Sequence, residues 1–181
     1  MEKTAKQDVK ALLIRYGMSD KATDVIADEL EALGYFDVPA SMNHHGAWPG
    51  GLFEHSWAVA VELVNFTVSL GLKWQMRRSP VLVGLLHDLC KTQCYRCMDG
   101  EWKPWRYEKC HGDLSVEMAE ELLKKAGAKP LTEEEKLCIR WHMGAFDAKE
   151  NWNHYGEAVT KYKTVLYTHT ADMVANRVLG V

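Results

Sequence analysis

Apolar side chains recur at helical spacing through the first third of the chain. Residues 4–16 and residues 20–33 each carry hydrophobic positions three and four apart, with charged residues between them. Gly17 and Gly34 follow as stop signals, and Asp20 is a candidate N-cap for the second segment. The pattern predicts two amphipathic helices within residues 4–34 whose function is packing.

Two later segments are apolar on almost every side, which is typical of buried central helices. The first, residues 52–64, follows a loop rich in proline and glycine (residues 38–51) and should extend to Gly71. The second begins at Ser79, a candidate cap, with Pro80 in its first turn. It ends abruptly in His87 and Asp88, and Lys91 follows three residues later.

The pattern changes in residues 93–109. Asp99-Gly100 lies between two arms rich in aromatic and basic residues, which is a strong hairpin signal. Pro104 restricts the second arm to an edge position. We expect a small two-stranded insertion here.

Helical periodicity returns after the insertion. One helix is expected from about residue 111 to Gly127, and another from Thr132, where Glu135 completes a capping box, to residues 142–144. Residues 145–156 are polar and indicate a loop, and a last helix should run from near Gly156 to Val178. The sequence therefore predicts an all-α bundle of about seven helices with a small β-hairpin insertion, forming one domain over residues 1–181.

Composition narrows the class of protein. The chain has 181 residues, of which 47% are hydrophobic, and a formal net charge of −3, which argues against a protein that coats nucleic acid nonspecifically. Five cysteines without a signal peptide indicate reduced thiols and a cytoplasmic protein. No apolar run approaches the roughly 20 residues that cross a bilayer, so no membrane association is expected.

Several polar residues lie within or at the ends of the apolar helical segments, where burying each one separately would be costly. They are His55, His87, Asp88, His142, His169 and Asp172, and His111 begins another helix. Gathering them around a cation would satisfy all of them, because imidazole and carboxylate suit divalent first-row metals. His169 and Asp172 are three residues apart and share a helix face, so His169 could support a ligating Asp172.

The order of these residues resembles that of the HD-domain metal-dependent phosphohydrolases. The similarity spans most of residues 42–178, the expected core, and rests on five ordered motifs. They are Gly50-Gly51-Leu52-Phe53-Glu54-His55-Ser56, Leu85-Leu86-His87-Asp88-Leu89-Cys90-Lys91, His111-Gly112-Asp113-Leu114-Ser115, Trp141-His142-Met143-Gly144 and His169-Thr170-Ala171-Asp172-Met173. The stretch from His44-His45 to His55 is most similar to the HD domain of bacterial 3′→5′ exoribonucleases.

Two features depart from the family pattern. Cys90 stands where the HDxGK motif has glycine, and the insertion at residues 93–109 is not part of the pattern. We also expect no nucleic-acid-binding module like that of the exoribonucleases, because 181 residues leave no room for one. The resemblance therefore supports an HD-type fold and metal site for this chain more firmly than it supports any particular substrate.

The resemblance implies a role for each motif residue. His55, His87, Asp88 and Asp172 would hold a first metal, and His111 and His142 a second, with Asp88 bridging. The site would hold one or two divalent metal ions, and the resemblance does not distinguish among Mn, Fe, Ni, Co, Mg and Zn. Asp88, Lys91 and Glu54 are the expected catalytic residues, and His44, His45, Lys91 and His169 are expected to contact substrate.

Several of these residues could instead have a purely structural role. Lys91 could be a solvated lysine at a helix end, and Glu54 a first-turn carboxylate that faces the helix dipole. Cys94, Cys97 and Cys110 could suggest a zinc site, which needs four ligands. The nearby candidate for the fourth ligand is His111, which the resemblance assigns to the second metal. The hairpin aromatics could stack on a nucleotide or single strand, or could simply pack on the body of the protein. His154 is expected at the surface.

The sequence thus predicts a hydrolase that cleaves a phosphate ester, monoester or diester, with metal-activated water. The expected partner is a phosphorylated small molecule, a nucleotide or a short single-stranded nucleic acid, and the oligomeric state is left open. The alternative is a non-catalytic HD-fold module that binds a nucleotide or a partner. A further alternative is exoribonuclease activity on recruited RNA, which predicts strongly salt-sensitive RNA binding.

Overall fold

The structure is a computed structural model that describes residues 4–43, 46–106 and 112–181. Within these ranges the chain is predominantly helical, and the predicted all-α class with a small hairpin is confirmed. The α-helices are α1 (Ala5–Arg15), α2 (Asp20–Ala32), α3 (Gly51–Leu70), α4 (Ser79–Leu86), α5 (Gly112–Lys125), α6 (Glu133–Arg140), α7 (Trp152–Lys161) and α8 (Lys163–Val174). Shorter elements are the 3-10 helices η1 (Leu89–Gln93), η3 (Gly144–Phe146) and η4 (Lys149–Asn151), the π-helix η5 (Ala175–Leu179), and strands β1 (Tyr95–Met98) and β2 (Glu101–Pro104).

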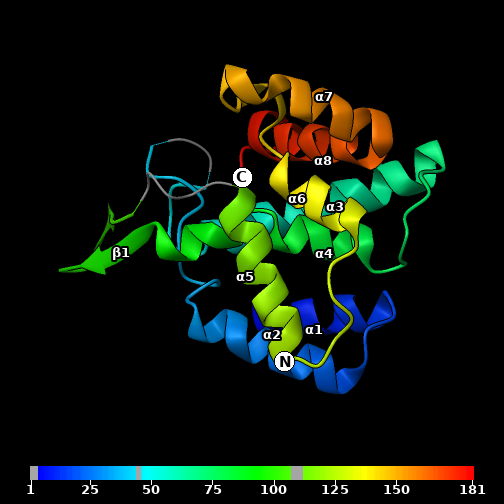
Figure 1. Ribbon diagram of the computed structural model, residues 1–181. Helices are drawn as coiled ribbons and strands as arrows, with labels where there is room; N and C mark the ends of the chain where they lie inside the picture. The colour runs from blue at the N-terminus through cyan, green and yellow to red at the C-terminus, as the bar shows by residue number, and fades with distance from the viewer. Residues whose placement is uncertain (1–3, 44–45, 107–111) are drawn as a thin grey trace.

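Helices α3 and α4 form the centre of the molecule and pack against each other. The pair α1 and α2 lies on one side of this centre, and α7 and α8 lie on the opposite side (Figure 1). Helix α5 packs on α2 and α6, and α6 packs on α8. One cluster of buried apolar residues connects these layers, and α3 and α4 supply its fully buried centre.

Local capping interactions explain most of the helix boundaries. Thr132 and Glu135 form the predicted capping box at the start of α6, and Gly71 ends α3 in the left-handed conformation (φ 65°). The N-cap of α2 is Ser19, whose hydroxyl accepts from the Ala22 amide, and not Asp20 as the sequence suggested. Both residues are good caps, so spacing alone could not separate them.

The start of α4 also differs from the prediction. Arg78 occupies the N-cap position, and the Ser79 hydroxyl donates to the Glu135 carboxylate (3.0 Å) instead of capping the helix. The buried Arg78 guanidinium pairs with the same carboxylate (3.1 Å). A buried charge needs such a partner, and this one ties the start of α4 to the start of α6.

The last predicted helix is in fact two helices. Tyr162 adopts an extended conformation (φ −136°, ψ 109°) that separates α7 from α8. Its hydroxyl reaches the Glu133 carboxylate (3.2 Å) at the start of α6. Helix α7 begins at Trp152, so the segment predicted as a loop, residues 145–156, contains η3, η4 and the first turn of α7. The helix count accordingly exceeds the predicted seven by one in the described ranges.

The hairpin forms at the predicted turn. Asp99 and Gly100 both have positive φ (55° and 81°), as a two-residue hairpin turn with the right twist requires. The strands pair from Tyr95 with Pro104 to Met98 with Glu101 and project from the body (Figure 1). Pro104 lies at the end of its strand, where the missing N–H costs least.

Candidate metal centre

Five of the predicted site residues converge from four helices. His55 lies in α3, His87 and Asp88 directly follow α4, His142 lies just beyond α6, and Asp172 lies in α8. Their exposed fractions are 0% for His55, 0% for His87, 5% for Asp88, 3% for His142 and 9% for Asp172. Burial of this many titratable groups in one place is costly unless they pair or bind a cation.

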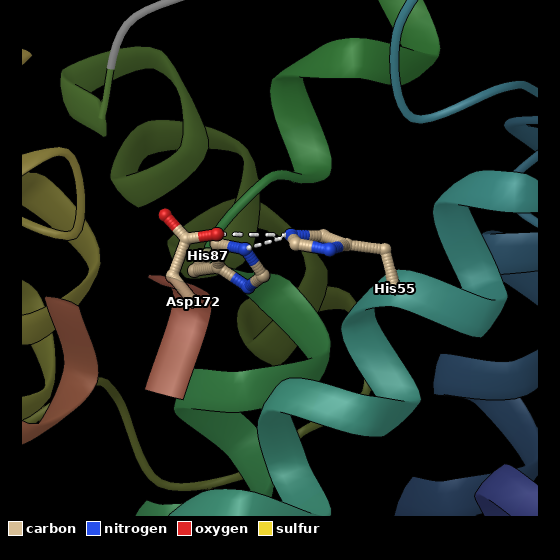
Figure 2. Close-up of side chains that lie close together, drawn as sticks. All are labelled: His55, His87 and Asp172. Atoms are coloured by element: carbon tan, nitrogen blue, oxygen red, sulfur yellow. Dashed lines mark hydrogen bonds and ion pairs between the residues drawn. The ribbon is translucent and has the colours of Figure 1, made fainter. Parts of the chain in front are cut away.

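The first group of possible metal ligands is His55, His87 and Asp172. The Nε2 atom of His55 lies 3.2 Å from Nε2 of His87 and 3.2 Å from Oδ1 of Asp172. Figure 2 shows the three side chains pointing at one another from α3, α4 and α8. This is the arrangement expected of ligands that share one ion.

The second group is His87, Asp88 and His142. Oδ1 of Asp88 lies 3.3 Å from Nε2 of His142, and Oδ2 lies 3.5 Å from Nε2 of His87. Oδ2 also lies 3.7 Å from Nε2 of His55. The two oxygens of Asp88 therefore face different histidines, and the carboxylate connects the two groups.

Main-chain carbonyls fix the orientation of His87 and His142. Nδ1 of His87 donates to the Gly84 oxygen (2.8 Å), and Nδ1 of His142 donates to the Ile139 oxygen (2.8 Å). Both carbonyls belong to the last turn of a helix, where no amide four residues on completes the ladder. A carbonyl can only accept, so each ring carries its proton on Nδ1, and Nε2 is left to face the centre.

These ligand geometries fit a divalent metal. With metal–nitrogen bonds of about 2.1 Å, two ligand atoms at 90–110° are separated by about 3.0–3.4 Å. The separations of His55 from His87 and from Asp172, both 3.2 Å, lie in this range. The second-sphere bond from Nδ1 to a carbonyl is also the usual partner of a ligating histidine. The buried histidines and carboxylates could therefore hold a divalent metal ion.

The protonation states of His87, Asp88 and Asp172 suit a cation as well. Burial lowers the pKa of His87 to about 4, so its Nε2 offers a lone pair at neutral pH. Burial alone would raise the pKa of Asp172, but its contact with His55 and the other neighbouring histidines together outweigh burial and lower the pKa to about 2. Burial likewise opposes ionisation of Asp88, yet the positive charge of Lys91 holds its pKa well below the ordinary value. Both carboxylates are ionised.

Lys91 extends this network toward the surface. Its ammonium lies 2.7 Å from Oδ2 of Asp88, and 18% of its side chain is exposed. Burial would lower the pKa of Lys91, but the Asp88 carboxylate reverses this and raises it. Lys91 is thus a permanent positive charge at the edge of the cluster. It is not the solvated lysine at a helix end that was the alternative interpretation of the sequence.

Close packing between α3 and α4 sets the distance between two of the ligands. A Cβ atom at Gly84 would lie 2.4 Å from the Cα of Ala60. Glycine is therefore required where the two helices cross, at a contact five residues after His55 in α3 and three residues before His87 in α4. The buried hydroxyl of Tyr35 donates to the Leu85 oxygen (2.7 Å) and holds the last turn of α4 from the other side.

The remaining predicted site residues occupy three kinds of position. Glu54 is exposed, and its carboxylate accepts from the Trp48 indole N–H (2.9 Å). His169 donates from Nδ1 to the main-chain oxygen of His142 (2.8 Å), which supports the turn behind that ligand. The ring of His169 fills the space beside Gly144, where a Cβ would approach it to 2.5 Å. His44, His45 and His111 lie outside the described residues.

The cysteine predictions have mixed outcomes. Cys90, Cys97 and Cys138 form no disulfide, as expected of reduced thiols, but Cys94 is disulfide-bonded, which contradicts that expectation. No cysteine belongs to a possible metal group within residues 4–43, 46–106 and 112–181. His154 is exposed as predicted and stacks on Trp141 (6.5 Å between ring centroids).

Several supporting features were missed at the level of the sequence. The orienting oxygens of Gly84, Ile139 and Val181 belong to the main chain and leave no mark on residue type. Gly84 could have been found, because a glycine inside an otherwise apolar helix marks close backbone approach or a functional reason. Tyr35 gave no such signal.

Comparison with known proteins adds no identification: no family model, no curated protein and no solved structure matches this chain. Among the helices of the described residues, none combines the length and apolar character that crossing a bilayer requires. The centre described above therefore stands on its geometry.

Proposed function

We propose that this chain is a metal-dependent phosphohydrolase of the HD type that cleaves a phosphate ester of a nucleotide or a short nucleic acid. The observation that carries the proposal is the convergence of histidine Nε2 atoms and two carboxylates in a buried centre, with each Nδ1 bonded to a main-chain oxygen. The order of the motifs along the chain supports the same assignment. A bound divalent metal would lower the pKa of a water ligand and polarise a phosphoryl oxygen.

Different residues of the centre would bind the metal ions and the phosphate. His55, His87 and Asp172 would bind one ion, and Asp88 and His142 would bind a second, with the Asp88 carboxylate as the residue that connects the two groups. Lys91 would neutralise charge on a phosphate oxygen, because its ammonium is fixed beside Asp88 and part of the side chain is exposed. An always-charged lysine is a good phosphate contact.

Metal analysis and hydrolysis assays test the proposal together. Wild-type protein prepared with Mn²⁺, Mg²⁺ or Ni²⁺ should retain metal and hydrolyse p-nitrophenyl phosphate, bis-p-nitrophenyl phosphate or a nucleoside monophosphate. Asp88→Asn preserves shape but removes the bridging charge, so it should lose metal and at least about 100-fold in kcat/KM, which corresponds to about 3 kcal/mol of transition-state stabilisation. Asp24→Asn, which alters an exposed carboxylate paired with Lys10, is the matched control.

The proposal fails if wild-type protein binds none of these metals and turns over none of these substrates. It also fails if Asp88→Asn keeps both the metal and the activity of wild type. A loss in Asp24→Asn equal to that in Asp88→Asn would show that the assay reports general damage.

One observation favours the alternative of a non-catalytic module. The Lys91 ammonium already pairs with Asp88, so part of the cluster is satisfied without a metal, as in a polar core that serves only structure or binding. Lys91→Met separates the two functions. In an enzyme it should lower kcat/KM while metal is retained, whereas in a binding module it should leave metal content and turnover at background levels.

The nucleic-acid form of the substrate has its own support in the hairpin. Trp105 is 52% exposed, and the Arg96 guanidinium lies 5.0 Å from its ring centroid. An exposed ring beside a cation can stack on a base and contact a phosphate. Trp105→Ala should weaken binding of a short single-stranded RNA and leave p-nitrophenyl phosphate hydrolysis unchanged. Equal RNA binding by both proteins would exclude the hairpin as the contact.

A further inference from the structure

His55 is oriented differently from the other two histidines of the centre. His87 and His142 each donate to the carbonyl three residues earlier, at the end of their own helix. His55 lies inside α3, where the helix ladder already uses the nearby carbonyls. Its Nδ1 instead reaches the main-chain oxygen of Val181, 126 positions along the chain (3.0 Å).

The segment that supplies this oxygen has a defined shape. Helix α8 continues into the π-helix η5, Ala175–Leu179, which packs against α3. Gly180 then turns the chain in the left-handed conformation (φ 78°), and the Val181 amide donates to the Ala175 oxygen (3.1 Å). Single π-turns are frequent at functional sites, because they re-aim the chain locally.

Hydrophobic burial does not explain why the chain folds back after Arg177. Val178 and Leu179 are 74% and 52% exposed, so their side chains contribute little packing. The side chain of Val181 is half-buried against the core, and its oxygen meets His55. Ala175 is buried at the start of the segment, and beyond it the positions that hold the chain near α3 are Val181 and the turn at Gly180.

We propose that residues 175–181 are a positioning segment for the metal centre. The Val181 oxygen holds the proton of His55 on Nδ1 and directs Nε2 toward His87 and Asp172. The same stretch of chain also continues from Asp172, so it places one ligand of the first group and orients another. This inference rests on the proposed metal function and adds a specific determinant of metal affinity to it.

Substitution at Gly180 tests the segment without changing any ligand. A β-branched residue is a strong outlier at positive φ, whereas asparagine tolerates that conformation. Gly180→Val should therefore displace Val181, and Gly180→Asn should retain it. Gly71→Val is the matched control, because Gly71 has a similar φ (65°), has open space around it and ends α3 at its other end.

Two measurements give the readout. Titration with Mn²⁺ should show affinity about 10–100-fold weaker in Gly180→Val, the usual effect of losing a second-sphere partner, and unchanged in Gly180→Asn and Gly71→Val. The ¹⁵N shifts of the His55 ring, assigned through His55→Gln, should report the proton on Nδ1 in wild type and its loss or exchange between nitrogens in Gly180→Val. A variant that lacks residues 180 and 181 should behave like Gly180→Val.

The outcomes distinguish this inference from the proposed function. If wild type binds none of Mn²⁺, Mg²⁺ and Ni²⁺ and turns over none of the substrates, the proposed function fails, and the ring shifts still test the positioning. If Gly180→Val keeps both the affinity and the ring tautomer of wild type, the positioning segment is refuted. It is also refuted if Gly71→Val weakens Mn²⁺ binding as much as Gly180→Val does, because the effect would then be general strain.

Discussion

The crossing of α3 and α4 at Gly84 provides a quantitative test of how the centre is held together. Gly84→Ala adds one methyl group where the nearest atoms are the Ala60 Cα (2.4 Å) and Ala60 N (2.5 Å). Real contacts of a Cβ atom are longer than 3 Å, and these neighbours are main-chain atoms. The helices must therefore move apart, and the separation of His55 from His87 must increase.

The expected cost follows from overpacking of a close-packed interior. Inserting a methyl group into a tightly packed core costs about 1–3 kcal/mol. For a chain of this size each kcal/mol shifts the melting temperature by about 2–4 °C. Gly84→Ala should therefore lower the melting temperature by about 2–12 °C and weaken Mn²⁺ binding at the same time. Alanine is the better helix former, so local propensity alone predicts the opposite sign.

Thermal unfolding and Mn²⁺ titration of Gly84→Ala and Gly156→Ala measure the effect. Gly156 lies inside α7 with open space at its Cβ position, so its replacement should gain about 0.5–1 kcal/mol. Adding Ala60→Gly to Gly84→Ala should not restore stability, because the closest clash is with main-chain atoms. The reasoning is refuted if Gly84→Ala is as stable as Gly156→Ala, or if Ala60→Gly rescues it fully.

Three further predictions concern single side chains. His169→Ala should weaken Mn²⁺ binding about 10–100-fold, because the donor to the His142 oxygen is lost, and His169→Asn should recover most of it; equal binding by all three proteins would contradict the role. Tyr35→Phe should cost about 1–3 kcal/mol in urea unfolding, because a buried carbonyl at the end of α4 loses its donor, and an unchanged midpoint would contradict this. In labelling with a thiol reagent at pH 8, Cys97→Ser should remove one fast equivalent and Cys138→Ser none, because burial raises the pKa of Cys138 to about 12; fast labelling of Cys138 in the folded protein would overturn the argument.

The residues of the candidate centre could be predicted from the sequence because their chemistry conflicts with their surroundings. His55, His87, His142 and Asp172 are polar residues in apolar helical segments, and such residues must find partners when the segments are buried. The structure brings all four together with Asp88. The fold class could be predicted from the periodicity of apolar residues, and the hairpin turn from Asp99-Gly100. Both features depend on the types of side chain, which the sequence states directly.

What the sequence did not predict depends on the main chain or on a single conformational choice. The break at Tyr162 leaves the apolar periodicity of α7 and α8 intact, so one continuous helix fitted the pattern equally well. The choice of Ser19 over Asp20 as a cap lies within the usual uncertainty of helix ends. The oxygen of Val181 belongs to the backbone, and its contact with His55 arises only when distant segments pack.

The way the histidines are oriented suggests a division between local and long-range control of the centre. His87 and His142 follow the ends of short helices, where unsatisfied carbonyls are available within the same turn, so their tautomers depend on a few neighbouring residues. His55 lies inside a long helix, and its hydrogen-bond acceptor is the main-chain oxygen of a residue far along the chain. A local change near α4 should therefore affect only His87 and Asp88, and one near α6 only His142. Loosening of residues 175–181 should affect His55 and Asp172 together, which makes the first group of ligands the more sensitive to long-range packing.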